Sequence, residues 1–284
     1  MSRFSHANFN AKNYAEARPT YVPKIYDLIS NFHKGARDAV VDVGSGPGNG
    51  TQGLLDLDFG KVYAVEPSIV MIEEGKNRPR GTEIDWFTGS GENLSQILPN
   101  KVDMITSFEA AHWMDHEKVE TWKECYEVLT PGGTVAHVMY GHTELLGNEK
   151  ASEIVLDFAR NKLKAYYMPQ HDIAFGLMDA IDPPSWATRV ERHKFLTKSK
   201  DGENQCIMTR ETTLRGLQEH AYSAYKQLKA QIYSWSPTDQ YVEEHPGEDP
   251  VGDIMKVIME LYNAKDLDHP ITMAWSLAVF LVSK

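Results

Sequence analysis

The clearest indication of the fold lies in the segment Val40-Val41-Asp42-Val43-Gly44-Ser45-Gly46-Pro47-Gly48-Asn49-Gly50-Thr51. It begins with a short apolar run that predicts a buried strand, and a glycine-rich turn follows directly. Glycine tolerates positive φ and allows the backbone to approach a bound molecule closely. A predicted helix begins after the turn, and the free amides at its start attract polar or anionic groups. The segment therefore predicts a strand–turn–helix unit at a ligand site.

Two common glycine motifs do not fit this turn. Counted from the end of the strand the spacing is G-x-G-x-G, whereas the dinucleotide fingerprint G-x-G-x-x-G requires a glycine where Asn49 stands. A second match, which starts at Gly48, lies too far from the strand. The chain contains no G-x-x-x-x-G-K-[ST] motif, which excludes a P-loop.

Residues 39–140 alternate short apolar runs with stretches long enough for helices. This alternation is typical of βαβ units in a parallel sheet. The predicted strands are Ala39–Val43, Lys61–Val65, Ile84–Thr88, Val102–Ser107 and Thr134–Tyr140, and the predicted helices are Gly50–Leu57, Ser68–Arg78 and Glu117–Leu129.

The pattern changes after residue 142. Helices are predicted within 144–182 (most clearly Glu149–Leu163), over Thr212–Tyr233 and over Asp253–Tyr262, and strands over Arg189–Leu196 and Ile271–Val282. We therefore expect an α/β, Rossmann-like fold with a mostly parallel seven-stranded sheet, helices on both faces and a helical cap inserted late in the chain. The predicted divisions of this single domain are a core at 34–142, cap insertions at 143–187 and 201–268, and core strands at 188–200 and 269–284.

Composition narrows the class of partner. The chain has 284 residues, a net charge of −11 and 42 % hydrophobic residues. An acidic chain without a basic run has no electrostatic footprint for nucleic acid. The longest apolar runs are shorter than the roughly 20 residues that a membrane span needs, and the N-terminus has no apolar signal core. Cys125 and Cys206 form neither a disulfide framework nor a metal-ligand spacing. We expect a cytoplasmic monomer or weak homodimer with a small-molecule substrate and no metal.

The first strand and its turn resemble the first motif of the class I S-adenosylmethionine (SAM) methyltransferases. That motif is an acidic residue in the strand followed by G-x-G-x-G, which Asp42, Gly44, Gly46 and Gly48 match. Glu66 closes the second predicted strand, where the family has an acid that accepts both ribose hydroxyls. NAD enzymes place an acid similarly, so Glu66 alone does not discriminate between them.

Further landmarks of this family follow in order. Residues 88–94 correspond to the loop near the adenine, residues 102–113 to the fourth strand that ends beside the methyl group, and residues 129–134 to an L-x-P-G-G turn. The resemblance implies SAM as cofactor and S-adenosylhomocysteine as product. The residues it implies at the cofactor are Asp42, Gly44, Ser45, Gly46, Gly48, Thr51, Glu66, Pro67, Met71, Ser90, Gly91, Glu92, Ser107 and Phe108.

A narrower resemblance is to the fungal trans-aconitate and cantharidin methyltransferase group. In that group a Y-x3-R-P-x-Y stretch, here Tyr14 to Tyr21, closes over the cofactor, so residues 1–33 are expected to form an N-terminal lid. Ala111-His112-Trp113 and Trp275-Ser276 also match. At 222–225 the group usually has W-S-x-Y, and Tyr222 replaces that Trp.

The candidate catalytic residues follow from the chemistry of the acceptor. A carboxylate is already ionised at neutral pH and needs no base, but it needs a cation or donor to hold it. Arg18 is the candidate clamp, with Tyr14 one helical turn before it. His112 is the candidate base or hydrogen-bond donor. The residues expected to line the substrate pocket are Tyr21, Trp113, Tyr222 and Tyr225.

Three functions stay open at this point. The favoured hypothesis is SAM-dependent carboxyl O-methylation of a small organic acid. The first alternative is a natural-product N- or O-methyltransferase with His112 as base. The second is a SAM-binding regulatory protein without turnover.

Overall fold

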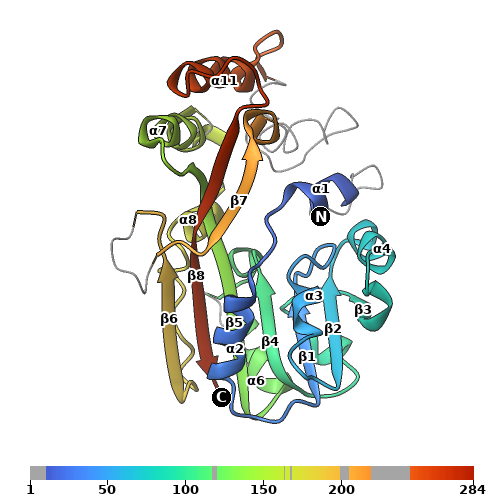
Figure 1. Cartoon of the computed structure of the whole chain (residues 1–284). Coiled ribbons are helices and arrows are strands. Elements are labelled where there is room, and N and C mark those ends of the chain that lie inside the picture. Colours follow the sequence, from blue (N-terminus) through green and yellow to red (C-terminus); the bar gives the residue numbers. More distant parts are fainter. Residues whose placement is uncertain (1–10, 117–119, 163, 167, 199–204, 219–243) are drawn as a thin grey trace.

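The computed structural model describes residues 11–116, 120–162, 164–166, 168–198, 205–218 and 244–284. Its centre is an eight-stranded sheet with the order β3-β2-β1-β4-β5-β8-β6, and β7 also pairs with β8 (Figure 1). Strands β1 to β5 are parallel, and β8 runs antiparallel to its three neighbours. The strands are β1 (Ala39–Val43), β2 (Lys61–Glu66), β3 (Asp85–Thr88), β4 (Val102–Phe108), β5 (Leu129–Leu145), β6 (Arg189–Phe195), β7 (Met208–Thr213) and β8 (Pro270–Ser283).

Helices cover both faces of the core sheet. Helices α2 (Pro23–Phe32) and α3 (Thr51–Leu54) pack on the face to which Val40 belongs. Helices α5 (Leu94–Ile97) and α6 (Glu120–Val128) pack on the opposite face, to which Val41 belongs. Successive side chains of a strand point to opposite faces. Because both faces of β1 are covered, its sequence is a continuous apolar run interrupted only by Asp42.

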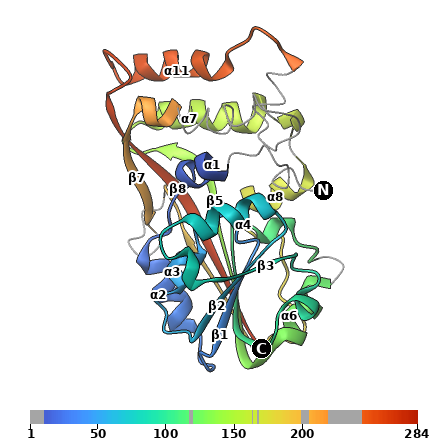
Figure 2. The same ribbon diagram turned by 90° about the vertical axis from the view of Figure 1, so that its right-hand side faces the viewer.

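Strands β5 and β8 continue beyond the core as an arm. β5 has 17 residues, where the sequence predicted a strand over Thr134–Tyr140, and its outer part still pairs with β8 at Leu145 and Met273. Strand β7 pairs with the same part of β8. The arm carries α7 (Glu149–Asp157) and α11 (Pro250–Leu261), which lie one above the other in both views (Figures 1 and 2).

The cap differs from its prediction in two places. The helix predicted over Thr212–Tyr233 is wrong at its start, because Met208–Thr213 forms β7 and the sheet has eight strands instead of seven. Residues 214–218 are helical, and the rest of that range lies outside the described residues. The helix predicted over Glu149–Leu163 is α7 followed by a π-helical turn, Phe158–Lys162. The division of the chain into core and cap segments stays a prediction.

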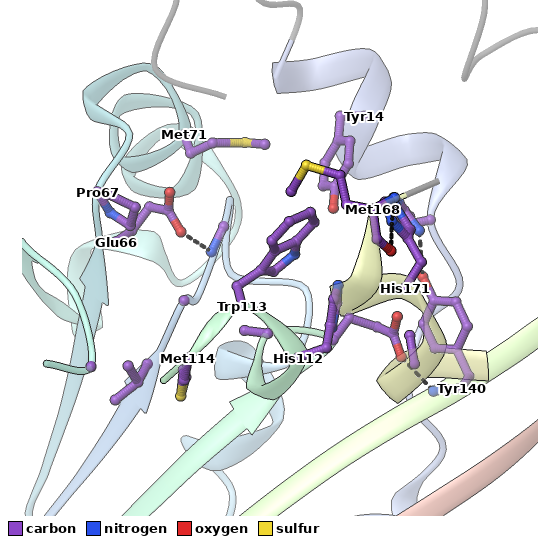
Figure 3. A pocket seen from close by; sticks show the side chains of 18 of the residues that line it. Tyr14, Glu66, Pro67, Met71, His112, Trp113, Met114, Tyr140, Met168 and His171 are labelled. Atoms are coloured by element: carbon purple, nitrogen blue, oxygen red, sulfur yellow. Dashed lines mark hydrogen bonds between the residues drawn. The ribbon is translucent and has the colours of Figure 1, made fainter. Parts of the chain in front are cut away.

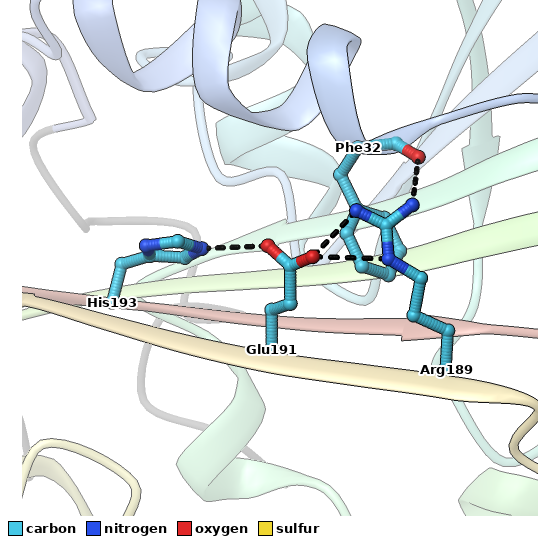
Figure 4. A network of polar contacts seen from close by, with 4 residues as sticks. All are labelled: Phe32, Arg189, Glu191 and His193. Atoms are coloured by element: carbon cyan, nitrogen blue, oxygen red, sulfur yellow. Dashed lines mark hydrogen bonds and ion pairs between the residues drawn. The ribbon is translucent and has the colours of Figure 1, made fainter.

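Edge strand β6 carries a polar network on alternating residues (Figure 4). Arg189 Nε and His193 Nε2 each bond a different oxygen of Glu191, both over 3.0 Å. The Arg189 guanidinium also donates to the Phe32 carbonyl over 3.4 Å and lies 4.2 Å from the centre of the Phe32 ring. Charged side chains discourage pairing of an edge strand with another chain, and this network also ties β6 to α2.

No helix in the described part of the chain is both long and apolar enough to span a membrane.

Candidate active site

The glycine loop after β1 adopts the backbone that its sequence predicts. Gly44, Gly46 and Gly48 have φ of +68°, +53° and +84°, in the left-handed region that favours glycine. The N–H groups of Gly44 and Ser45 both donate to the Val65 carbonyl, over 2.8 and 3.2 Å, and hold the loop against β2. A Cβ on Gly44 would lie 2.5 Å from the Ala110 Cβ, so the close packing there also requires glycine.

Asp42 and Thr51 lie beneath the loop. The Asp42 carboxylate accepts from Thr51 Oγ1 over 2.5 Å and from Thr106 Oγ1 over 2.9 Å. Burial raises the pKa of Asp42 to about 7, although both hydroxyl groups act to lower it. These bonds fix the loop to the start of α3 and to β4. The two residues, predicted at the cofactor, therefore support the loop from below.

Glu66 ends β2 and faces the loop. It is buried, and its two oxygens accept the N–H groups of Gly46 and Ser68, each over 2.9 Å. Figure 3 shows its side chain in the wall of the cavity. Burial raises the pKa of Glu66 to about 7, against the effect of the two N–H donors. A carboxylate oxygen accepts more than one hydrogen bond, so this side chain fits a vicinal diol such as a ribose.

A cavity of about 630 Å³ opens beyond Glu66, at the carboxyl ends of β1, β2 and β4. Ligands of open α/β sheets bind at this edge, and the volume is within the roughly 300–1,000 Å³ usual for small-molecule sites. The structure brings together most of the predicted site residues in its wall, namely Tyr14, Arg18, Gly44, Gly46, Glu66, Pro67, Met71, Ser90, Gly91, Glu92, His112 and Trp113.

Other predicted site residues lie outside this wall. Ser107 Oγ bonds His137 Nδ1 over 2.7 Å in the interior. Phe108 packs against Tyr21, with 4.7 Å between ring centres, so both contribute to the core behind the cavity. Gly48 and Ser45 belong to the loop without lining the cavity. The predicted pocket residues Tyr222 and Tyr225 lie outside the described residues.

Arg18 is held at the far end of the cavity from several directions. Its guanidinium donates to Tyr140 Oη over 3.1 Å and lies 4.8 Å from the centre of the Tyr14 ring. Its carbonyl accepts from Arg210 of β7 over 2.8 Å. Burial opposes its charge, but Tyr14, Tyr140 and Glu109 raise the pKa of Arg18. The end of the cavity that lies away from Glu66, called here the acceptor end, therefore carries a fixed positive charge.

Several residues of the acceptor end were missed from the sequence. They come from the loop after β4, from β5, from α8 (Pro169–Phe175) and from β8. Glu109 stands directly after a buried strand, a position at which a charged residue is a recognisable signal. Trp275 belongs to the Trp275-Ser276 match described above, and the others carry no local signal. These missed residues are Glu109, Tyr140, His142, Thr143, Met168, His171, Phe175 and Trp275.

His112 reaches the cavity as a neutral imidazole. Burial first, and then His171 and Arg18, lower the pKa of His112 to about 3. Its ring centre lies 4.8 Å from that of Trp113, and its Nδ1 atom has no hydrogen-bond partner among the described residues. Trp113 is 39 % exposed and packs edge-on to His171 (Figure 3). An imidazole with so low a pKa is a weak base.

The end of the cavity beside Glu66 is called here the inner end, and its residues fit SAM. A buried carboxylate faces the loop, positive-φ glycines bring the backbone close, and Met71 adds an apolar side chain to the same wall. Within the described ranges, no three His, Cys, Asp or Glu side chains are grouped to hold a metal ion. The expectation that no metal takes part stays a prediction. The sheet order, the glycine loop and the acid at the end of β2 together define a class I methyltransferase fold.

Comparisons with known proteins agree with this class. The Methyltransferase domain family matches residues 40–133. The chain is 25 % identical to the probable S-adenosylmethionine-dependent methyltransferase CRG1 of Saccharomyces cerevisiae, over 99 % of this chain and 98 % of that protein. It is 33 % identical to the methyltransferase cfoB of Aspergillus candidus over 49 % of this chain and 44 % of that protein. A putative type II methyltransferase from Anaeromyxobacter dehalogenans has the same fold, with a TM-score of 0.70 at 18 % identity over 93 % and 97 % of the two chains. The protein is an S-adenosylmethionine-dependent methyltransferase.

Proposed function

We propose that the protein transfers a methyl group from SAM to a carboxylate of a small organic acid and forms a methyl ester. The observation that carries this proposal is the fixed guanidinium of Arg18 at the acceptor end, held by Tyr14 and Tyr140. A charge-assisted bond from arginine is suited to a carboxylate. The acid is expected to be trans-aconitate-like or cantharidin-like, as the resemblance of the N-terminal stretch implies.

The reaction requires the protein mainly to hold SAM and the acceptor in the correct relative position. SAM supplies an electrophilic methyl group on a sulfonium, which an in-line nucleophile displaces. Correct alignment of two reactants lowers a barrier by about 7 to 11 kcal/mol in the best intramolecular cases. In this chain Glu66 and the glycine loop bind the cofactor at the inner end of the cavity. Arg18 orients the anionic acceptor at the other end.

The environment of His112 favours an acceptor that is already ionised. A general base works best when its pKa lies near the working pH, whereas the pKa of His112 is lowered to about 3. The imidazole therefore stays neutral at physiological pH and serves as a hydrogen-bonding wall of the site. This supports carboxyl methylation over the alternative in which His112 removes a proton from a phenol or amine.

The test is methyl transfer from radiolabelled SAM to separate pools of acids, phenols and amines, with trans-aconitate and cantharidin-type acids in the first pool. Base-labile label in the acid pool, seen as volatile methanol after mild alkali, is the expected result. Base-stable label in the phenol or amine pool would overturn carboxyl methylation. SAM binding without transfer to any pool would favour a regulatory protein.

A further inference from the structure

Glu109 has a backbone conformation that residues other than glycine rarely adopt. Its φ is +56°, and such conformations in non-glycine residues cluster at functional sites. Packing and hydrogen bonds hold it there. Its N–H donates to the Val138 carbonyl over 2.9 Å, and its Oε1 atom accepts the N–H of Tyr140. The strained turn directs the chain after β4 into the wall of the cavity.

The carboxyl group of Glu109 and the guanidinium of Arg18 share the acceptor end through Tyr140. The Tyr140 N–H donates to Glu109, and its hydroxyl group accepts from Arg18. The second oxygen of Glu109, Oε2, has no hydrogen-bond partner among the described residues, while Glu109 lines the cavity. Glu109 is only partly buried, and its Oε2 atom is not enclosed by protein, so this oxygen is open to a molecule bound in the cavity.

We propose that Glu109 selects the charge of the acceptor: its Oε2 atom carries a proton that it donates to an acid group held by Arg18, and loss of that proton expels the acid. This inference rests on the proposed function because it takes Arg18 as the clamp for a carboxylate. It adds a specificity-determining residue that the proposed function does not need.

The electrostatics of the acceptor end agree with this role. Burial raises the pKa of Glu109 to about 8, although the Tyr140 N–H and Arg18 act to lower it. At pH 7 the carboxyl is therefore mostly neutral, and the positive charge of Arg18 is available to an anion. Above pH 8 the carboxylate offsets that charge and repels the acceptor.

The other groups that face Glu109 do not change charge in the same range. The pKa values of Tyr21 and Tyr140 are raised, mainly by burial, and that of His112 is lowered to about 3. Arg18 stays charged because its pKa is raised. Tyr14 faces Arg18 from helix α1 (Ala11–Ala17). At the inner end, Asp42 and Glu66 have pKa values raised to about 7, and their titration acts on the cofactor end of the cavity.

The experiment measures binding of trans-aconitate by calorimetry to the full-length protein saturated with S-adenosylhomocysteine, at pH 7, 8 and 9. The saturating cofactor product removes the contribution of the inner end. We expect the dissociation constant of the wild type to rise by up to about tenfold between pH 7 and 9, as a single ionisation with this pKa dictates. The Glu109→Gln variant, which keeps a donor but cannot ionise, should bind as the wild type does at pH 7 and show no rise.

Glu124→Gln is the matched control. Glu124 is also buried and accepts a backbone N–H, that of Ser95 over 2.7 Å, but it lies on α6 away from the cavity. It should keep the wild-type pH profile. If Glu109→Gln does not fold, Glu109→Asn supplies a second neutral variant, because asparagine tolerates positive φ.

The outcomes separate this inference from the proposed function. A flat profile in the wild type, an unchanged rise in Glu109→Gln, or no binding at pH 7 overturns the role of Glu109. A Glu109-dependent profile without any base-labile ester would leave that role intact and overturn carboxyl methylation. Ester formation with identical profiles in both proteins would overturn only the inference about Glu109.

Discussion

Asn49 joins the glycine loop to the first helix of the chain, because its Nδ2 atom donates to the Ala15 carbonyl over 3.0 Å. The Oδ1 atom of the same side chain accepts from Arg78, which also donates to the Pro47 carbonyl over 3.1 Å. Helix α1 (Ala11–Ala17) carries Tyr14 and leads into Arg18. The cofactor loop and the anion clamp are therefore connected by one amide side chain.

This connection predicts that Asn49→Ala weakens both ends of the site. Loss of a hydrogen bond of this kind costs about 0.5–1.5 kcal/mol. We expect the KM values for SAM and for the acid to rise together, by roughly three- to tenfold, in steady-state kinetics. Asn161→Ala is the control, since Asn161 is exposed and its side chain bonds only Asp157 among the residues that the structure describes. A rise confined to the acceptor would contradict a shared role.

How much of the site follows from the sequence depends on how local each part is. Gly44, Gly46 and Glu66 are all within or beside one βαβ unit, so motif spacing places them together. The acceptor end gathers Tyr14, Glu109 and Tyr140, which are far apart along the chain. Their proximity results from the pairing of β4 with β5 and from the packing of α1, and no pattern in a single sequence encodes it.

The missed strand has a similar explanation. β7 reads Met-Thr-Arg-Glu-Thr-Thr, and most of it is polar because the arm is open to solvent on one side. This strand lacks the apolar alternation that indicates a strand. The apolar positions from Leu214 onward have helical spacing, so the pattern predicts a helix that begins at Thr212, two residues too early. Pairing with the outer half of β8 makes these residues a strand, and Arg210 of β7 then reaches the carbonyl of Arg18.

The position of Glu66 predicts that its replacement weakens cofactor binding. Glu66→Ala removes the acceptor facing the ribose and leaves the N–H groups of Gly46 and Ser68 without partners. We expect the dissociation constant of S-adenosylhomocysteine to rise by roughly 10- to 100-fold, in line with about 1–3 kcal/mol for a lost charged acceptor. Calorimetry measures it, and unchanged affinity would refute the assignment.

The same residue predicts a pH dependence. The pKa of Glu66 is raised to about 7. The carboxylate form, which accepts both hydroxyl groups of the cofactor's ribose, is therefore lost as the pH falls from 8 to 6. Affinity for S-adenosylhomocysteine should fall over this range in the wild type. In Glu66→Gln, affinity should be low throughout and vary less with pH.

The position of Arg18 predicts which acceptors are methylated less efficiently when this residue is replaced. Arg18→Met removes the only permanent cation that lines the cavity in the described part of the chain. We expect kcat/KM for an acid acceptor to fall by at least about tenfold, since a hydrogen bond to a charged group is worth about 1.5–3 kcal/mol. A neutral acceptor from the same screen should lose much less. Arg189→Met on β6 is the control, because the Arg189 guanidinium also lies over an aromatic ring, that of Phe32, but at the exposed edge of the sheet (Figure 4). Equal losses for both kinds of acceptor would reject the clamp.

Two histidines that pack against Trp122 of α6, the half-buried His116 and the buried His137, predict a loss of stability in acid. His116 packs 4.9 Å from Trp122 and 5.3 Å from His137 between ring centres, and its Nδ1 atom has no partner within the described residues. Burial lowers the pKa of His116 to about 4, against effects of the Ala111 carbonyl, Glu92 and Asp115 that raise it. The unfolded chain therefore binds the proton first, and stability present above pH 6.5 is lost as the pH falls toward 4.

The measurement is urea unfolding at pH 7.5 and 5.5 for the wild type and for His116→Gln, whose amide keeps a donor for the Ala111 carbonyl. The raised pKa values of Asp42 and Glu66 act in the opposite direction, but they are common to both proteins and cancel in the comparison. We expect the wild type to lose about 1 kcal/mol more than the variant between the two pH values. His193→Gln, at a half-exposed site on β6, should behave as the wild type. An identical pH response in His116→Gln would show that the His116 imidazole is not the group that resists protonation.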